Sequence, residues 1–233
     1  MQIVIKGISS MATRQLLAEL AVAFKQQSGC VVLFESVGGV DAVKRIQAGE
    51  VFDLAVLTSD AIDKLMATGT IRAGSRVDLV KSGVAVAVRA GAALPDISSA
   101  DAVRLTVRAA RSISYSTGPS GVALAKLFAR WGIADEVQSR MVQAPPGVPV
   151  APLLASGQVE LGFQQLSELL HVEGVAVVGP LPPAIQITTT FSAGIPTRAS
   201  ADSSRAEQVS ALLEFMTSPQ AAEAKRRLGM EPV

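Results

Sequence analysis

Residues 112–121 read Ser-Ile-Ser-Tyr-Ser-Thr-Gly-Pro-Ser-Gly, and residues 122–128 continue as Val-Ala-Leu-Ala-Lys-Leu-Phe. A short apolar run ends in hydroxyls and glycines, and a helical pattern begins immediately afterwards. This order predicts a strand, a loop and a helix N-terminus whose free backbone N–H groups face an anion. The alternative is that a hydroxyl only caps the helix, with Pro119 in its first turn.

The predicted loop offers two kinds of donor. Hydroxyl groups donate from side chains, and glycines let the backbone approach a ligand without a Cβ in the way. The candidate ligand-binding residues of this loop are Ser116, Thr117, Gly118, Ser120 and Gly121.

The first seventy residues alternate between apolar strands, at 3–5, 31–34 and 54–57, and segments of helical periodicity. This alternation predicts a parallel sheet with right-handed crossovers and an α/β fold. Ligands of such sheets bind beyond the carboxyl ends of the strands. Four further residues therefore join the candidate site, namely Ser9, Ser10, Gly38 and Gly39.

Two later apolar runs, at about 83–88 and 185–191, are long enough to connect two bodies. We therefore expect two lobes joined by hinge strands at these positions. The first lobe takes residues 1–82 and a C-terminal return at 192–233, and the second takes residues 88–186.

Composition narrows the class of protein. The chain has 233 residues, 49% hydrophobic and 18% charged, which predicts a compact globular protein. Its 21 basic and 20 acidic residues give no surplus for binding nucleic acid or an anionic membrane. With one cysteine, Cys30, and one histidine, His171, we expect no disulfide framework, no metal site and no cofactor.

No stretch reaches the roughly 18 apolar residues that a membrane span requires. The opening Met-Gln-Ile-Val-Ile-Lys lacks the charged and apolar regions of a secretory signal. Two locations stay open. The protein is cytoplasmic, or it is periplasmic and a signal peptide has been trimmed.

Five short motifs, in this order, resemble the periplasmic molybdate-binding proteins of ABC transporters, which are type-two solute-binding proteins. They are Ile-Ser-Ser-Met at 8–11, Gly-Gly-Val at 38–40, Phe-Asp-Leu-Ala at 52–55, Ala-Ser-Gly-Gln-Val-Glu-Leu-Gly-Phe at 155–163 and Ser-Pro-Gln-Ala-Ala at 218–222. The resemblance implies a two-lobed fold with crossing hinge strands, a small anion in the interlobe cleft and an ABC-transporter permease as partner. We expect a monomer.

Position by position, the resemblance assigns an anion-binding hydroxyl to Ser10 and backbone donors to residues 117–121 and to Gly147 or Val148. Two positions depart from the family pattern. Gly38 stands where the family has a serine, and Gln165 where it has a tyrosine. A tetrahedral oxyanion thereby loses two hydroxyl donors, and binding of such an anion depends on satisfying all of its acceptors. Lys6, at the end of the first strand, adds a positive charge that could fix a carboxylate. We therefore expect an organic polycarboxylate to be a better ligand than a tetrahedral oxyanion.

The related bacterial aconitate isomerases provide the alternative, an enzyme on the same scaffold that moves a proton along an aconitate-like tricarboxylate. This reaction needs an acid/base group, for which Lys6, Glu35 and Tyr115 are the candidates. Lys6 and Glu35 also have structural interpretations, as a solvated strand end and as a partner of a helix N-terminus. Binding without catalysis requires only that the lobes close on the ligand.

Overall fold

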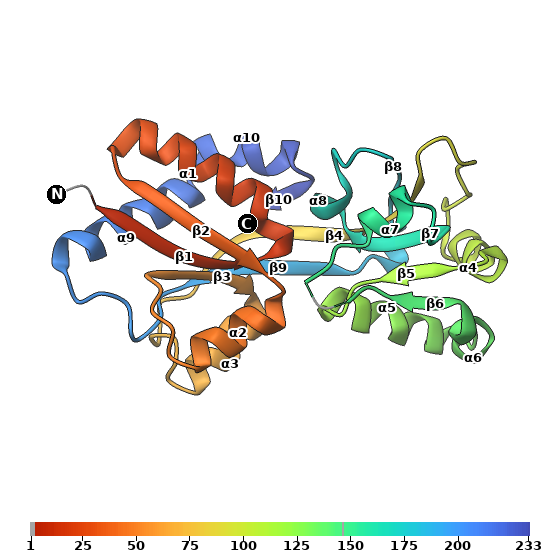
Figure 1. Cartoon of the computed structure of the whole chain (residues 1–233), viewed down its shortest axis with the longest axis horizontal. Coiled ribbons are helices and arrows are strands. Elements are labelled where there is room, and N and C mark those ends of the chain that lie inside the picture. Colours follow the sequence, from red (N-terminus) through yellow and green to blue (C-terminus); the bar gives the residue numbers. More distant parts are fainter. Residues whose placement is uncertain (1–2, 146) are drawn as a thin grey trace. The chain divides into compact units, whose positions relative to one another are not determined.

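The structure is a computed structural model that describes residues 3–145 and 147–233. Met1, Gln2 and Pro146 lie outside the described residues. The chain divides into two compact units, one from residues up to Lys81 together with Thr190–Val233, the other from Ser82–Thr189. Each contains helices and strands (Figure 1). The α/β class predicted from the alternating pattern is confirmed.

The first unit contains three parallel strands, β1 (Val4–Ser10), β2 (Val31–Val37) and β3 (Leu54–Thr58), with β1 in the middle. The next strand, β9 (Thr188–Gly194), runs antiparallel to β3, and β4 (Val77–Arg89) follows in the strand order. The short strand β10 (Met230–Pro232) pairs with β4. The helices are η1 (Met11–Thr13), α1 (Arg14–Ser28), α2 (Gly39–Gln47), α3 (Ser59–Ala67), α9 (Ser203–Thr217) and α10 (Pro219–Arg227).

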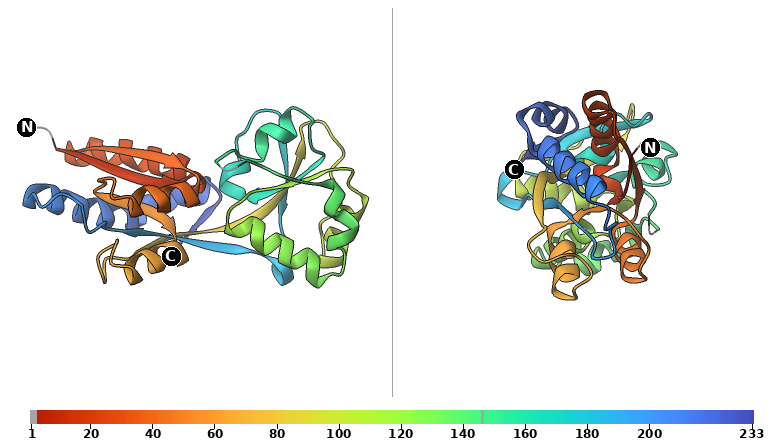
Figure 2. Two further views of the ribbon diagram at one scale, coloured as in Figure 1. Left: turned by 60° about the horizontal axis from the view of Figure 1, so that its bottom comes forward. Right: turned by 90° about the vertical axis from the view of Figure 1, so that its left-hand side faces the viewer.

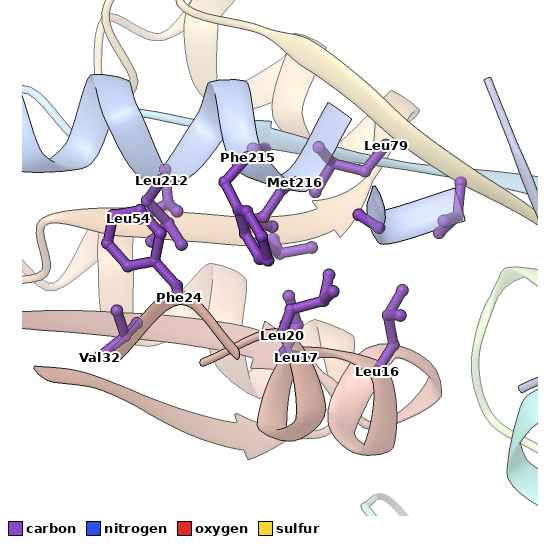
Figure 3. Packing of buried hydrophobic residues seen from close by; sticks show 14 of the residues in the cluster. Leu16, Leu17, Leu20, Phe24, Val32, Leu54, Leu79, Leu212, Phe215 and Met216 are labelled. Carbon is purple, nitrogen blue, oxygen red and sulfur yellow. The ribbon is translucent and has the colours of Figure 1, made fainter. Parts of the chain in front are cut away.

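Alternation along the strands sorts their side chains between two cores, because successive residues point to opposite faces. On β3, Leu54 and Val56 pack with α1, α9 and α10, whereas Ala55 and Leu57 pack with α2 and α3. Figure 3 shows the first core, where α1 meets α9. The right-hand view of Figure 2 shows α2 and α3 (orange) on the side away from α1 (red). Helices on both faces explain why β3 is continuously apolar from Leu54 to Leu57.

The second unit has parallel strands β5 (Ile113–Tyr115), β6 (Met141–Gln143) and β7 (Leu161–Gln165), with β5 in the middle. The strand β4 runs antiparallel to β7 and to β8 (Val175–Pro180). The helices are α4 (Ala100–Ala109), α5 (Pro119–Arg130), α6 (Ala134–Val137), η2 (Gln138–Arg140), α7 (Ala151–Ala155), α8 (Leu166–Leu169) and η3 (Pro183–Ile185).

The same sorting occurs on β4. Val84, Val86 and Val88 join a core with α4, α5 and α6, while Ala85 and Ala87 join a core with α7. The larger side chains therefore face the longer helices. The same alternation determines which polar residues of β4 and its neighbouring strands share a face of the sheet.

Two strand boundaries differ from the predicted ones. The strand β4 begins at Val77, well before the apolar run, and β9 begins at Thr188. Pro183–Ile185 forms a 3₁₀ turn, and the Gln186 side chain accepts the N–H groups of Val84 and Ile187. The Gln186 side chain thus takes part in place of backbone hydrogen bonds between strands where β9 was expected to start. Within the described residues, no helix is both long and apolar enough to cross a bilayer.

Candidate functional site

The loop after β5 leads directly into α5, as its sequence predicts. Gly118 precedes the helix with extended backbone, Pro119 is its first residue, and no side chain caps it. The Ser116 and Ser120 hydroxyl oxygens lie 3.3 Å apart. The α5 N-terminus therefore keeps the partial positive charge of its uncapped N–H groups.

Gly121 is required by its surroundings. A Cβ atom at this position would lie 1.9 Å from the Ser116 carbonyl oxygen and 3.0 Å from a ring carbon of Tyr115. No side chain fits at such distances, so the loop packs directly against the first turn of α5. Thr117 lies between these contacts and is partly exposed.

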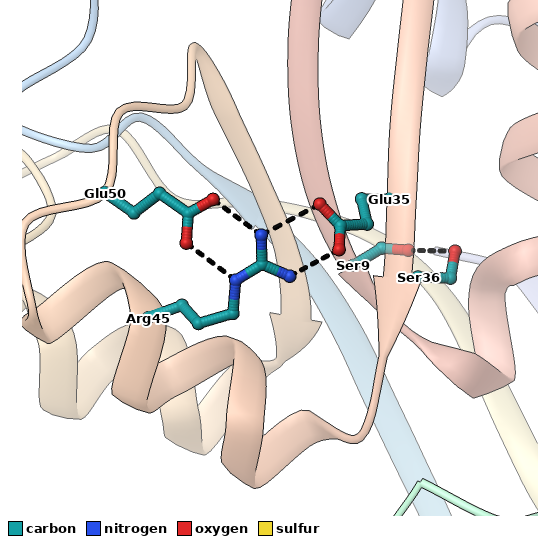
Figure 4. Close-up of polar contacts among 5 residues, drawn as sticks. All are labelled: Ser9, Glu35, Ser36, Arg45 and Glu50. Atoms are coloured by element: carbon teal, nitrogen blue, oxygen red, sulfur yellow. Dashed lines mark hydrogen bonds and ion pairs between the residues drawn. The ribbon is translucent and has the colours of Figure 1, made fainter.

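In the first unit, the loop after β1 places two serines differently. The Ser9 hydroxyl lies 2.8 Å from the Ser36 hydroxyl on β2 (Figure 4), so these groups satisfy each other. Ser10 is 7% exposed, and its buried hydroxyl has no partner among the described residues. Burying an unpaired hydroxyl costs about 1–3 kcal/mol, so this group is ready to donate to a ligand.

Gly38 and Gly39 lie beside Ser10. Gly38 precedes α2 with extended backbone, and no side chain caps this helix. A Cβ atom on Gly39 would lie 3.9 Å from the Ser10 Cβ. The carboxyl end of β1 and the N-terminus of α2 thus meet, as the parallel sheet predicts.

Gln165 ends β7 and is 3% exposed. Its side-chain N–H group donates to the Thr189 hydroxyl at 2.9 Å, and its Oε1 atom has no partner among the described residues. No pattern in the sequence pointed to Thr189. It lies 24 residues further along the chain, and no spacing pattern links the two.

Two candidate residues lie in surroundings that differ from the expected ones. Lys6 does not end its strand, because β1 continues to Ser10, four residues or about 13 Å further on. Lys6 is exposed, and its backbone pairs with Asp53. The Val148 N–H group donates to the Pro145 carbonyl at 3.0 Å, so a turn already uses the donor assigned to a ligand.

Glu35 lies in an ion-pair network. The Arg45 guanidinium lies between the carboxylates of Glu35 and Glu50 and donates two hydrogen bonds to each (Figure 4). Hydrogen bonding to Arg45 lowers the pKa of Glu35 below its usual range. The lowered pKa makes the half-exposed carboxylate a weaker base, and Arg45 occupies both of its oxygens, so Glu35 is a poor candidate for moving a proton. The structure thus favours a structural role for Glu35, as an ion-pair partner of Arg45 rather than of a helix N-terminus.

Tyr115 keeps a position compatible with catalysis. It ends β5 directly before the donor loop, and its ring packs against the core that contains Phe128 and Phe163. Its backbone carbonyl accepts the Ala144 N–H group at 2.9 Å.

Among residues 3–145 and 147–233, no three His, Cys, Asp or Glu side chains gather to hold a metal.

Comparisons with known proteins agree with this architecture. The chain is 36% identical to an aconitate isomerase from a Pseudomonas species over 223 residues, which cover 92% of this chain and 82% of that protein. The Azotobacter vinelandii periplasmic molybdate-binding protein has a similar structure, with a TM-score of 0.79 at 23% identity, covering 97% and 98% of the two chains. The sulfate-binding protein SubI from Mycobacterium tuberculosis has a TM-score of 0.76 at 16% identity, covering 100% and 88%.

The resemblance expected from the five motifs is confirmed by these relatives. A family model described as bacterial extracellular solute-binding protein matches residues 5–231, nearly the whole length. The chain belongs to the bacterial extracellular solute-binding protein family.

Proposed function

We propose that this protein binds a small organic polycarboxylate as the solute-binding component of an ABC-type transporter, in the periplasm. The observation that carries the proposal is the pair of uncapped donor helices. The α2 N-terminus lies next to the buried, unpaired Ser10 hydroxyl, and the α5 N-terminus follows the hydroxyl-rich loop. Each set suits one carboxylate group.

Polycarboxylates are favoured over molybdate by the residues that replace hydroxyl donors. Gly38 has no side chain, and Gln165 already gives one N–H group to Thr189. The Pseudomonas relative also supports this choice, because it is an aconitate isomerase and aconitate is a tricarboxylate. The candidate ligand-binding residues are Ser9, Ser10, Gly38, Gly39, Ser116, Thr117, Gly118, Ser120, Gly121 and Gln165. Ser9 supports Ser36 rather than offering a free hydroxyl.

The test is a panel of anions measured by calorimetry and thermal shift, namely molybdate, tungstate, sulfate, phosphate, citrate and both aconitates. A ligand that binds only the folded state stabilises it in proportion to ln(1 + [L]/Kd). We expect stabilisation by a polycarboxylate. Tight molybdate binding, with none for citrate or aconitate, would contradict the proposal.

Isomerisation of an aconitate-like tricarboxylate is the second candidate, because the 36%-identical relative is an aconitate isomerase. A base would remove a proton from one allylic carbon, and the same proton would return at the other end, so nothing else is consumed. Of the three candidate groups, Tyr115 is the one at a strand end beside a donor loop.

Proton NMR of cis- and trans-aconitate incubated with the protein separates the two functions. Interconversion that stops in Tyr115→Phe, while calorimetric binding persists, would establish catalysis by the phenol. Binding without interconversion in the parent protein supports the transport function. Tyr115→Phe then changes affinity at most.

A further inference from the structure

Two buried polar atoms of the second unit have no hydrogen-bond partner among the described residues and belong to residues at neighbouring positions of two paired strands. The Ser82 hydroxyl and the Gln165 Oε1 atom are both enclosed, their residues being 1% and 3% exposed, and neither has a hydrogen-bond partner among the described residues. Buried polar groups are nearly always bonded, and an unbonded one costs about 1–3 kcal/mol. A pair of them indicates that a third group completes the site.

Strand register places both on one face of the sheet. Gln165 lies opposite Val84 in the antiparallel β4–β7 ladder, and directly opposite residues share a face. Ser82 precedes Val84 by two residues and therefore points the same way. Both face the side that carries Val84, Val86 and Phe163 in the α5 core.

The Gln165–Thr189 hydrogen bond passes over Ser82. In the strand order, β4 lies between β7, which carries Gln165, and β9, which carries Thr189. The Val84 N–H group donates to the Ile187 carbonyl, and Ser192 bonds Asp78, so β4 and β9 run in opposite directions. Two residues beyond Ile187, Thr189 thus lies beside Ser82.

The free atoms define what can bind. Oε1 of Gln165 accepts a hydrogen bond and cannot donate one, whereas the Ser82 hydroxyl does either. A carboxylate has no proton for Oε1. An O–H group donates to Oε1 while accepting from Ser82, so it satisfies both atoms at once.

We propose that Ser82 and Gln165, with Thr189 fixing the Gln165 amide, form a buried receptor for one O–H group. The group belongs either to a ligand hydroxyl or to a water molecule. In the first case the receptor determines specificity among polycarboxylates, a role that rests on the proposed function. In the second, the water fixes Gln165.

Ser114 supplies a matched control. It is also fully buried, and its hydroxyl has no partner among the described residues, but it lies opposite Gly162, where an added Cβ atom would lie 2.7 Å from the side chains of Val150 and Leu154 in the α7 core. Ser114→Ala therefore removes a comparable hydroxyl from the other face of the sheet. Neither Ser82→Ala nor Ser114→Ala removes a bond to a described residue, so both variants should fold.

The first experiment needs no ligand. In ¹⁵N-labelled protein, the side-chain amide signals of Gln165 are assigned by their loss in Gln165→Met. We expect Ser82→Ala to shift these signals and speed their exchange with solvent, and Ser114→Ala to leave them unchanged. Unchanged Gln165 signals in Ser82→Ala would overturn the receptor, whether or not a polycarboxylate binds.

The second experiment identifies the source of the O–H group. Citrate and tricarballylate differ by one hydroxyl, and their affinities are compared by calorimetry. If the ligand supplies the group, Ser82→Ala lowers the citrate preference about three- to tenfold, the usual value of one hydrogen bond. If Ser82→Ala leaves the ratio of citrate to tricarballylate affinity unchanged but shifts the Gln165 amide signals, the O–H group belongs to water. Binding of neither acid by the parent contradicts the proposed function and leaves the NMR result standing.

Discussion

The two donor helices are held in place by different forces. The helix α5 is fixed by close backbone packing, since Gly121 allows the Ser116 carbonyl to touch the first turn. The helix α2 is tied to β2 by exposed ion pairs from Arg45, near its C-terminus, to Glu35. Steric contacts do not respond to pH or salt, whereas exposed ion pairs do. The α5 loop should thus be rigid but intolerant of substitution, and the α2 loop adaptable.

The hydroxyl groups differ as well. In the α5 loop, Ser116 and Ser120 lie near each other, and Thr117 is partly exposed. In the first unit, the Ser10 hydroxyl is buried and has no partner in the part of the chain that the structure describes. The Ser10 hydroxyl is therefore already removed from water in the free protein, whereas the Thr117 hydroxyl loses its contact with water only when a ligand binds.

Gly121→Ala should have the largest effect. The added methyl group would overlap the Ser116 carbonyl, so the loop must move, at a cost of about 3 kcal/mol or more in unfolding free energy. Urea denaturation and calorimetry measure stability and ligand binding. Gly118→Ala is the matched control, because its Cβ would lie 3.6 Å from the Ser116 hydroxyl. Equal stability of both variants would show that α5 is not held by packing.

Thr117→Val should weaken anion binding by about 1.5–3 kcal/mol, the value of a hydrogen bond to a charged group. The fold should remain intact, because the hydroxyl is not needed to cap α5. Calorimetry with the best ligand of the panel gives the change. Binding as tight as that of the parent protein would mean that the loop only begins a helix.

Ser10→Ala tests the first unit and should weaken binding by about 1.5 kcal/mol. Its unfolding free energy should stay equal or rise slightly, since the free protein loses no hydrogen bond. Ser9→Ala is the control with the opposite pattern. It leaves Ser36 unpaired, costs about 1 kcal/mol of stability and affects binding less. If Ser10→Ala lowered the unfolding free energy and Ser9→Ala did not, the Ser10 hydroxyl would make a hydrogen bond that stabilises the folded protein.

Glu35→Gln should have the smallest effect. Arg45 lowers the pKa of Glu35, so the carboxylate stabilises the folded state above the unfolded pKa of about 4.3. That contribution is lost as the pH falls through the lower folded-state pKa. The variant should melt slightly earlier than the parent at pH 7 and equally in strong acid. Ligand binding and any aconitate interconversion should persist, and their collapse would restore Glu35 as a catalytic candidate.

Patterns in the sequence were sufficient for the architecture. The apolar runs at 3–5, 31–34 and 54–57 predicted the parallel strands β1, β2 and β3, because they alternate with segments of helical periodicity. The glycine-rich loop before α5 was predicted in place, since its turn chemistry is local. The strands β6, β8 and β10 were missed, and β9 was placed three residues early. One of the competing hydrogen bonds of Gln186 joins its side chain to Val84, 102 positions earlier in the chain.

In the candidate site, too, local features were predictable from the sequence and contacts between distant residues were not. The sequence alone determined which loops carry donors, because capping, glycine and hydroxyl patterns act within a few residues. Only the tertiary structure decided which donors are free. It paired Ser9 with Ser36, Glu35 with Arg45 and Gln165 with Thr189, and it left the Ser10 and Ser82 hydroxyls without a partner among residues 3–145 and 147–233. Hydrogen bonds between distant segments depend on strand order and register, which no single stretch of the chain encodes.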